Sequence, residues 1–192
     1  MLYDLAVLLE RTLGGPHWYV AFFLWLPIQT FLLVAVHEAG HALAALARRQ
    51  PDVEVRMGTG QSLVLELRLQ AVKLRLANPG FLKLGSGQVR WNSERTTILD
   101  PLIIAAAGPA ASLLGGLVCL WLAAQCPLYS QSHDFFALTA VWMFGFGAFL
   151  NLVPLTLSEG SRKRPGVQVR TDGGIILDLL RLIASLRADA GS

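Results

Sequence analysis

The segment WYVAFFLWLPIQTFLLVAVHEAGH, residues 18–41, combines a charge-free apolar run with an H-E-x-x-H motif from His37 to His41 at its end. A helix of about 20 apolar residues crosses the hydrocarbon core of a bilayer. Residues four apart lie on one face of a helix, so the two histidines can bind one Zn²⁺ while Glu38 accepts a proton from a water at the metal. The segment therefore predicts a transmembrane helix that carries the zinc motif of a metalloprotease near one end.

The composition is that of a membrane protein. Hydrophobic residues make up 54% of the 192 residues and charged residues only 15%, which favours burial in lipid. Two further stretches, between Pro101 and His133 and between Phe135 and Ser158, also lack Asp, Glu, Lys and Arg. We expect one membrane-embedded domain over residues 1–192. Its three transmembrane helices are expected at about residues 18–47, 100–124 and 135–157.

The expected fold is a membrane all-α core of three transmembrane helices. Two smaller elements complete it, a small β region and a C-terminal helix. Residues 63–69 and 72–76 mostly alternate apolar with polar side chains, a period typical of strands. We expect a small antiparallel β region on the cytoplasmic side, at about residues 52–92, which either caps the membrane face or offers an edge to a substrate. Residues 173–188 place apolar side chains on one helical face, which predicts an amphipathic helix at the membrane surface or docked on the core.

The distribution of basic residues predicts the orientation in the membrane. Only Arg11 precedes the first span and no Lys or Arg lies between Gln125 and Asp134, whereas the other 15 of the 16 lie from Arg48 to Arg95 or in the C-terminal tail. Because basic residues accumulate on the cytoplasmic side, we expect a multi-pass protein of the cell (inner) membrane with its N-terminus outside. The C-terminus and the active site then face the cytoplasm. The net charge of +3 reflects this topology and contact with the lipid bilayer, and we expect no nucleic-acid partner.

A catalytic zinc usually has three protein ligands and one open position for water, so the two histidines need a third ligand. Two acids compete for this role. Glu159 follows Asn151 and Pro154 closely, but a basic and flexible run comes after it. Asp172 lies at the start of the expected C-terminal helix, where the backbone can fix its side chain. We favour Asp172 as the third ligand and keep Glu159 as the alternative.

Three motifs occur in this chain: H-E-x-x-H from His37 to His41, Gly108-Pro109 in the second span, and Asn151-x-x-Pro154 with a later Asp172-Gly173. Together they resemble the motifs of the site-2 protease family of intramembrane zinc metalloproteases. The resemblance implies that the two histidines and the aspartate bind one catalytic Zn²⁺, that the glutamate is the general base, and that the site lies within the membrane near the cytoplasm. It also implies that the β region offers an edge to an extended substrate segment.

The chain departs from the pattern of that family at two positions. Ser112 stands where the Gly-Pro motif usually continues to Asn. Glu159-Gly160 occupies the place where an Asp-Gly pair usually follows Asn-x-x-Pro within a few residues. The first departure concerns one polar contact and the second concerns the identity of the third ligand. We also expect a minimal core without a PDZ domain.

The expected activity is hydrolysis of peptide bonds in or near the transmembrane segment of a membrane-protein substrate, by a zinc metalloendopeptidase with Glu38 as general base. Asn151 either donates a hydrogen bond to the substrate or oxyanion or packs between helices. The alternative is a non-catalytic multi-pass membrane protein of the same fold that binds a partner or zinc. The intact H-E-x-x-H motif favours the enzyme, and the oligomeric state stays open.

Overall fold

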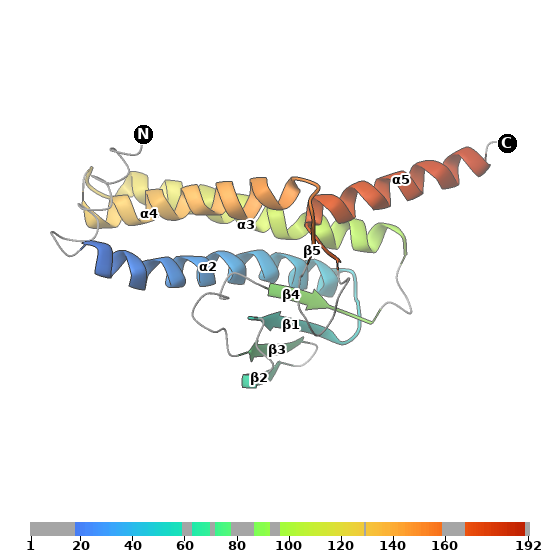
Figure 1. Cartoon of the computed structure of the whole chain (residues 1–192), viewed down its shortest axis with the longest axis horizontal. Helices are drawn as coiled ribbons and strands as arrows, with labels where there is room; N and C mark the ends of the chain where they lie inside the picture. Colours follow the sequence, from blue (N-terminus) through green and yellow to red (C-terminus); the bar gives the residue numbers. More distant parts are fainter. Residues whose placement is uncertain are drawn as a thin grey trace.

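Three long apolar helices lie side by side and form the core of the molecule (Figure 1). The computed structural model describes residues 18–58, 63–69, 72–77, 87–92, 97–128, 130–158 and 168–190. The long helices are α2 (Trp18–Ala47), α3 (Leu99–Gln125), and α4 (Gln131–Trp142) continued by the π-helix η1 (Met143–Leu150).

The three expected helices are confirmed, and their length and composition suit a membrane protein. Segments Leu26–Ala47, Leu99–Gln125 and Ser132–Leu150 are each long and apolar enough to cross a bilayer. The expected end of the third helix, near residue 157, is wrong, because the regular helix ends before Val153. The residue that precedes a proline is disfavoured in the helical region, so Pro154 stops the helix at this point.

Small residues allow the long helices to approach one another closely. Gly40 of α2 faces α3, where a methyl group in place of its hydrogen would lie within 3.0 Å of the Ala107 carbonyl oxygen and the Ala111 side chain. Gly116 of α3 is similarly pressed against the ring of Phe144 on η1. Close backbone approach of this kind is typical of helix packing in lipid. The approach at Gly40 brings the two motif histidines against α3.

The β region is a four-stranded sheet in the order β2-β3-β1-β4. The expectation of an antiparallel region is correct for two of the strand pairs, β2 with β3 and β1 with β4, but wrong for the third, because β1 and β3 are parallel. The reason is topological: β3 folds back on β2 through a short connection, and it then inserts beside β1 in the same direction. The strands are β1 (Val53–Met57), β2 (Leu63–Leu69), β3 (Val72–Ala77) and β4 (Gly87–Arg90).

The sheet packs on the end of α2 that follows the motif. Val53, Val55 and Met57 of β1 are buried, and they join Ala42 and Ala45 of α2 in one apolar cluster. The side chains between them point to the opposite face, because successive residues of a strand alternate. The sheet is thus anchored beside the two histidines, with β4 as an edge strand among those that the structure describes.

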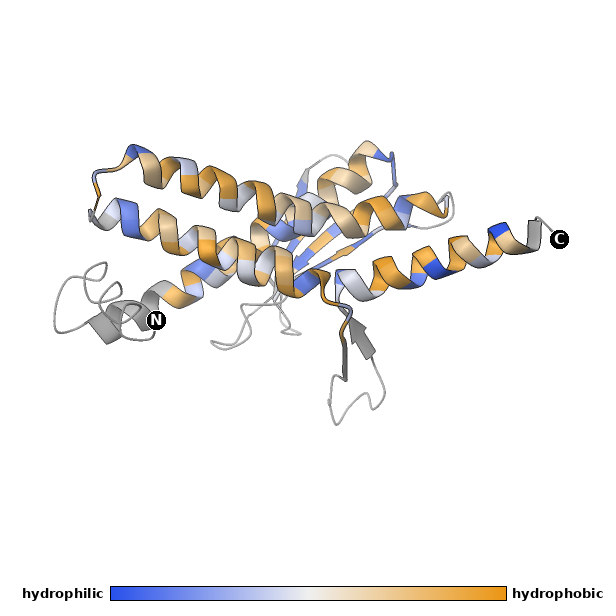
Figure 2. Ribbon diagram, turned by 90° about the horizontal axis from the view of Figure 1, so that it is seen from above, coloured by the Kyte–Doolittle hydropathy of each residue, from blue (hydrophilic) through white to orange (hydrophobic). Residues whose placement is uncertain are grey.

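The C-terminal part begins with a short antiparallel pair, β5 (Thr156–Ser158) and β6 (Gln168–Arg170), and continues as helix α5 (Asp172–Ala190). The expected C-terminal helix is confirmed within two residues at each end. Its first part packs against α3, and the rest extends beyond the end of the bundle (Figures 1 and 2). Figure 2 also shows that α5 mixes hydrophilic with apolar residues, whereas the long helices are predominantly apolar.

Candidate metal centre

Three candidate ligands meet where α2, α3 and the start of α5 converge. Nε2 of His37 lies 2.9 Å from Oδ2 of Asp172, and Nε2 of His41 lies 3.4 Å from Oδ1 of the same carboxylate. The two Nε2 atoms lie 3.2 Å apart. Both histidines are buried and the aspartate is half-buried. The structure thus brings together the three side chains that the sequence predicted as ligands.

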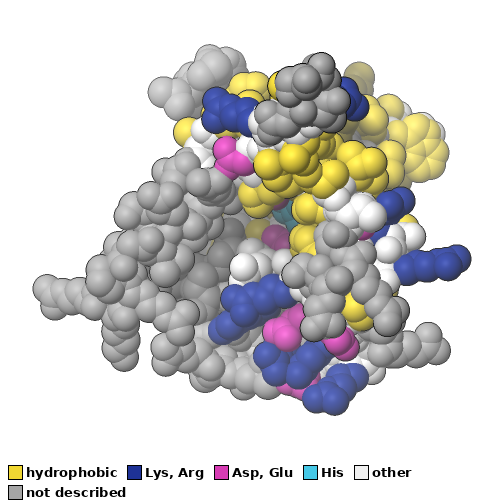
Figure 3. All heavy atoms as spheres, turned by 90° about the vertical axis from the view of Figure 1, so that its right-hand side faces the viewer, with side chains coloured by type: hydrophobic (Ala, Val, Ile, Leu, Met, Phe, Trp, Pro, Cys, Tyr) yellow, Lys and Arg dark blue, Asp and Glu magenta, His cyan; other side chains and the backbone are white. Residues whose placement is uncertain are grey.

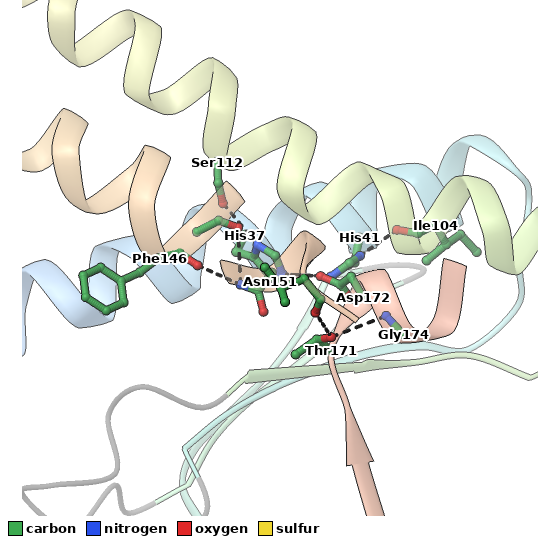
Figure 4. A network of polar contacts seen from close by, with 11 residues as sticks. His37, His41, Ile104, Ser112, Phe146, Asn151, Thr171, Asp172 and Gly174 are labelled. Atoms are coloured by element: carbon green, nitrogen blue, oxygen red, sulfur yellow. Dashed lines mark hydrogen bonds and ion pairs between the residues drawn. The ribbon is translucent and has the colours of Figure 1, made fainter. Parts of the chain in front are cut away.

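The Nδ1 atom of each histidine ring lies within hydrogen-bond distance of a group on α3 (Figure 4). Nδ1 of His41 lies 2.6 Å from the Ile104 carbonyl oxygen, which can only accept, so this nitrogen carries the proton. Nδ1 of His37 lies 3.1 Å from Oγ of Ser112, which is completely buried. When Nδ1 donates, Nε2 keeps its lone pair and is the atom that can bind a metal.

Gly108 of α3 leaves room for the imidazole rings of His37 and His41. A methyl group at this position would lie within 3.0 Å of the Nε2 atoms of both His37 and His41. The glycine of the Gly-Pro motif therefore has a steric role, because any side chain here would occupy the place where the two ring nitrogens converge.

Asp172 reaches the centre because the residues on either side of it are tied to the end of the third helix. The Thr171 hydroxyl donates to the Val153 carbonyl oxygen at 2.6 Å and accepts from the Leu155 amide at 3.0 Å. On the other side, Gly173 packs so closely on the Leu152 carbonyl that no side chain would fit. The carboxylate is thus fixed at the start of α5.

A backbone hydrogen bond between Thr171 and Leu155 brings two distant parts of the chain together just before Asp172. The Thr171 amide donates to the Leu155 carbonyl oxygen at 3.1 Å, so residues 156–170 leave and re-enter at almost the same point. In space, the aspartate therefore follows Pro154 almost directly, although many residues separate them in the chain. The rival ligand, Glu159, lies outside the described residues.

Glu38 lies beside the ligands and is buried, with 7% of its surface exposed. Gly87, the first residue of β4, packs directly on its side chain. The candidate base thus lies between the histidines of its own helix and the edge strand of the sheet.

Asn151 lies close to the ligands in Figure 4. Its amide nitrogen donates to the carbonyl oxygens of Phe146, at 3.1 Å, and of Gly147, at 3.3 Å, on the preceding turn of its own helix. Its amide nitrogen is therefore engaged within η1 in this arrangement.

The residues present fit a zinc ion. Two imidazole nitrogens and one carboxylate make the donor set of a catalytic zinc site, and zinc with ligands at about 2.0–2.1 Å in tetrahedral geometry separates the ligand atoms by about 3.3 Å. The three separations here, 2.9, 3.2 and 3.4 Å, bracket that value.

The centre lies behind a hollow in the molecular surface. Figure 3 shows the molecule from the right-hand side of Figure 1, where the surface is hollowed between apolar side chains above and charged side chains below. Histidine and acidic side chains are visible inside this hollow. Access from this end suits a hydrolytic site, because water must reach it.

The sequence did not predict two groups that support the histidine ligands. Ser112 was noted only as a departure from a family pattern, and it supports His37. The Ile104 carbonyl, which supports His41, is a backbone group without any sequence signal. Both contacts join positions more than 60 residues apart, 75 for Ser112 and 63 for Ile104, so no local pattern reveals them.

Comparison with known proteins places these residues in a family. A search of curated proteins finds no match to this chain. A family model described as Peptidase family M50 matches residues 26–159, which is more than half of the chain. The matched range contains the H-E-x-x-H motif, the Gly-Pro motif and Asn151, and it ends before Asp172. The chain therefore belongs to Peptidase family M50, the site-2 protease family of intramembrane metalloproteases.

Proposed function

We propose that this protein is an intramembrane zinc metalloendopeptidase that cleaves a membrane-protein substrate in or near its transmembrane segment. The observation that supports this most is the convergence of His37, His41 and Asp172, next to the buried carboxylate of Glu38, among helices that are long enough to cross a bilayer. A buried cluster of ionisable side chains in such a setting is costly and is usually retained for function.

The metal would be held by His37, His41 and Asp172. When bound, zinc supplies a Lewis acid that polarises the scissile carbonyl and lowers the pKa of water toward about 7. Glu38 takes the proton from the attacking water and then gives it to the leaving amine. Ser112 and the Ile104 carbonyl keep the two imidazole rings in the orientation that this requires.

The substrate would bind as an extended segment along β4. A peptide bond inside a helix is protected by internal hydrogen bonds, so the segment around it must unwind before it reacts. An edge strand offers replacement hydrogen bonds to the opened segment. β4 has a partner on one side only among the described strands, and it begins next to Glu38.

Asn151 would stabilise the oxyanion that forms during hydrolysis. Its amide now donates to two carbonyls of η1, and rotation of the side chain would release one N–H group toward a substrate at the centre. Asn151 directly follows the π-helix η1, and π-helical turns are frequently found at functional sites.

The orientation that we propose has the N-terminus outside and the active site and C-terminus toward the cytoplasm, in the cell (inner) membrane. The accumulation of basic residues on the side of the sheet and α5 supports it.

The test is cleavage of a membrane-anchored substrate by purified wild-type protein and by Glu38→Gln, with the zinc content of both measured. We expect both to hold zinc, because Glu38 is not a ligand, and only the wild type to cleave. Cleavage by Glu38→Gln would refute the mechanism. Zinc without cleavage in either protein would favour the alternative, a non-catalytic protein that binds a partner or the metal.

The ligand assignment is tested separately with Asp172→Ala and Glu159→Ala. We expect the aspartate variant to lose zinc and the glutamate variant to retain it. The opposite pattern would make Glu159 the third ligand.

A further inference from the structure

The backbone conformation of Gly87 does not require a glycine at this position. Gly87 lies at the start of β4, where it pairs with Met57 of β1 in a regular antiparallel register. Among the described glycines, a positive φ occurs at Gly58 and not at Gly87. Any residue could adopt this backbone conformation. The requirement for glycine must therefore come from what its missing side chain would touch.

A methyl group at Gly87 would collide with Glu38. The three heavy atoms nearest to such a group are Cγ, Cδ and Oε1 of Glu38, and all lie within 3.0 Å. Because Cγ is among them, rotation about the outer bonds of the glutamate cannot relieve the collision. The side chain would have to leave its rotamer at the first bond, and this would carry the carboxylate away from its present place.

We propose that Gly87 is a positioning residue for the general base. The absence of a side chain at Gly87 lets the carboxylate of Glu38 lie between the histidines and the edge strand. The same strand that receives the substrate then fixes the base, so a segment paired with β4 is aligned with Glu38 as well as with the metal centre. This inference rests on the proposed function.

Two glycines thus border the site and serve different groups. Gly108 on α3 leaves room for the Nε2 atoms of the ligands, whereas Gly87 on β4 leaves room for the base. Substitution of each by alanine should separate the two functions. The Gly108 variant is expected to lose zinc, and the Gly87 variant is expected to keep it.

The experiment compares wild type, Gly87→Ala and Gly145→Ala, each as the full chain in liposomes with a membrane-anchored substrate. Gly145 is the matched control, because a methyl group there meets nothing within 4 Å. For Gly87→Ala we expect a wild-type zinc content, little change in KM and a fall in kcat of about 100-fold, the usual cost of a misplaced catalytic group. Wild-type kcat in Gly87→Ala, or a fall that is matched by loss of zinc, would overturn the proposal.

A second measurement tests the contact without using activity. Gly87→Ala is introduced into wild type and into Glu38→Ala, which lacks Cγ, and the thermal unfolding midpoint is measured for all four proteins. We expect the alanine at position 87 to lower the midpoint in wild type and to do so much less in Glu38→Ala, because the colliding atoms are gone. Equal decreases in both backgrounds would overturn the proposal.

The failure of this inference can be distinguished from the failure of the proposed function. If Glu38→Gln is inactive while Gly87→Ala is fully active, only the inference is wrong. If Glu38→Gln retains activity, Glu38 is not the base and both are wrong.

Discussion

At the level of single residues, the centre depends also on groups that are not ligands. His37 is oriented by Ser112, whose hydroxyl lies 3.1 Å from Nδ1 and is completely buried. Loss of such a support typically weakens metal binding by about 10–100-fold. We therefore predict that Ser112→Ala binds zinc about 10–100-fold more weakly than wild type, as measured by competition with a chelator.

The control for this prediction is Ser185→Ala, which removes a hydroxyl from the exposed part of α5, far along the helix from Asp172. It should bind zinc like the wild type. If Ser112→Ala also binds zinc like the wild type, the hydroxyl does not support the ligand.

Single residues of the centre differ in how well the sequence alone can predict them. His37, Glu38 and His41 are neighbours on one helix, so their spacing was enough to predict that their side chains lie together. Asp172 was also predicted, because the start of a helix is recognisable. Ser112 was not predicted as a partner, since its contact with His37 depends on how two helices pack.

At the level of elements, the chain returns at Thr171 to the point that it left at Leu155. Leu155 and Thr171 are joined by the hydrogen bonds that close β5 and β6. Cα atoms of paired antiparallel residues lie about 4.5–5.5 Å apart, which a two-residue turn can span. We predict that replacement of residues 156–170 by Asn-Gly leaves the zinc content of the purified protein unchanged.

The same deletion combined with Asp172→Ala is the control, and it should lose zinc. Loss of zinc from the deletion alone, with helix content unchanged by circular dichroism, would show that the strands themselves hold Asp172 in place.

The sheet provides a prediction of pH dependence. Glu66 on β2 lies 3.0 Å from Nζ of Lys73 and 3.1 Å from Nε of Arg75, both on β3. Hydrogen bonds from Lys73, and then from the arginines, lower the pKa of Glu66 from 4.5 to about 2. Since the folded-state pKa lies below the unfolded one, this stabilisation is present above pH 4.5 and is lost as the pH falls toward 2.

We therefore predict that Glu66→Gln lowers the thermal unfolding midpoint near neutral pH, and that its difference from wild type shrinks as the pH falls toward 2. Asp178→Asn on α5 is the control. The carboxylate of Asp178 lies 3.9 Å from an exposed Arg181, and an exposed pair of this kind contributes little, so this variant shows how the loss of an exposed carboxylate alone changes the pH dependence of the midpoint. A difference between Glu66→Gln and wild type that does not depend on pH would contradict the prediction.

At the level of the whole molecule, the order of the elements along the chain determines which groups lie at the same end of the helix bundle. The metal centre uses the C-terminal half of α2, the N-terminal half of α3 and the start of α5, and the sheet lies at the same end of the bundle (Figure 1). The sequence predicted three helices and a β region between the first two. It did not predict the parallel pairing of β1 and β3, because strand order depends on contacts beyond a hairpin.

In the proposed topology, the turn between α3 and α4 and the helix α5 lie on opposite sides of a membrane, so one labelling experiment tests the orientation. The turn between α3 and α4 contains Leu128, which is 72% exposed, and α5 contains Ser185, which is also exposed. With Cys119 and Cys126 replaced by serine, we predict that a membrane-impermeant thiol reagent labels Leu128→Cys in intact cells. Ser185→Cys should react only after the cells are permeabilised, because the proposed orientation has the basic residues and α5 on the cytoplasmic side.

The control is the same pair of variants in permeabilised cells, where both cysteines should react. The reverse pattern in intact cells would place the metal centre and α5 outside. It would then exclude a cytoplasmic active site, even if the protein binds zinc and cleaves its substrate, because the site, the sheet and α5 lie at one end of the bundle and must face the same side.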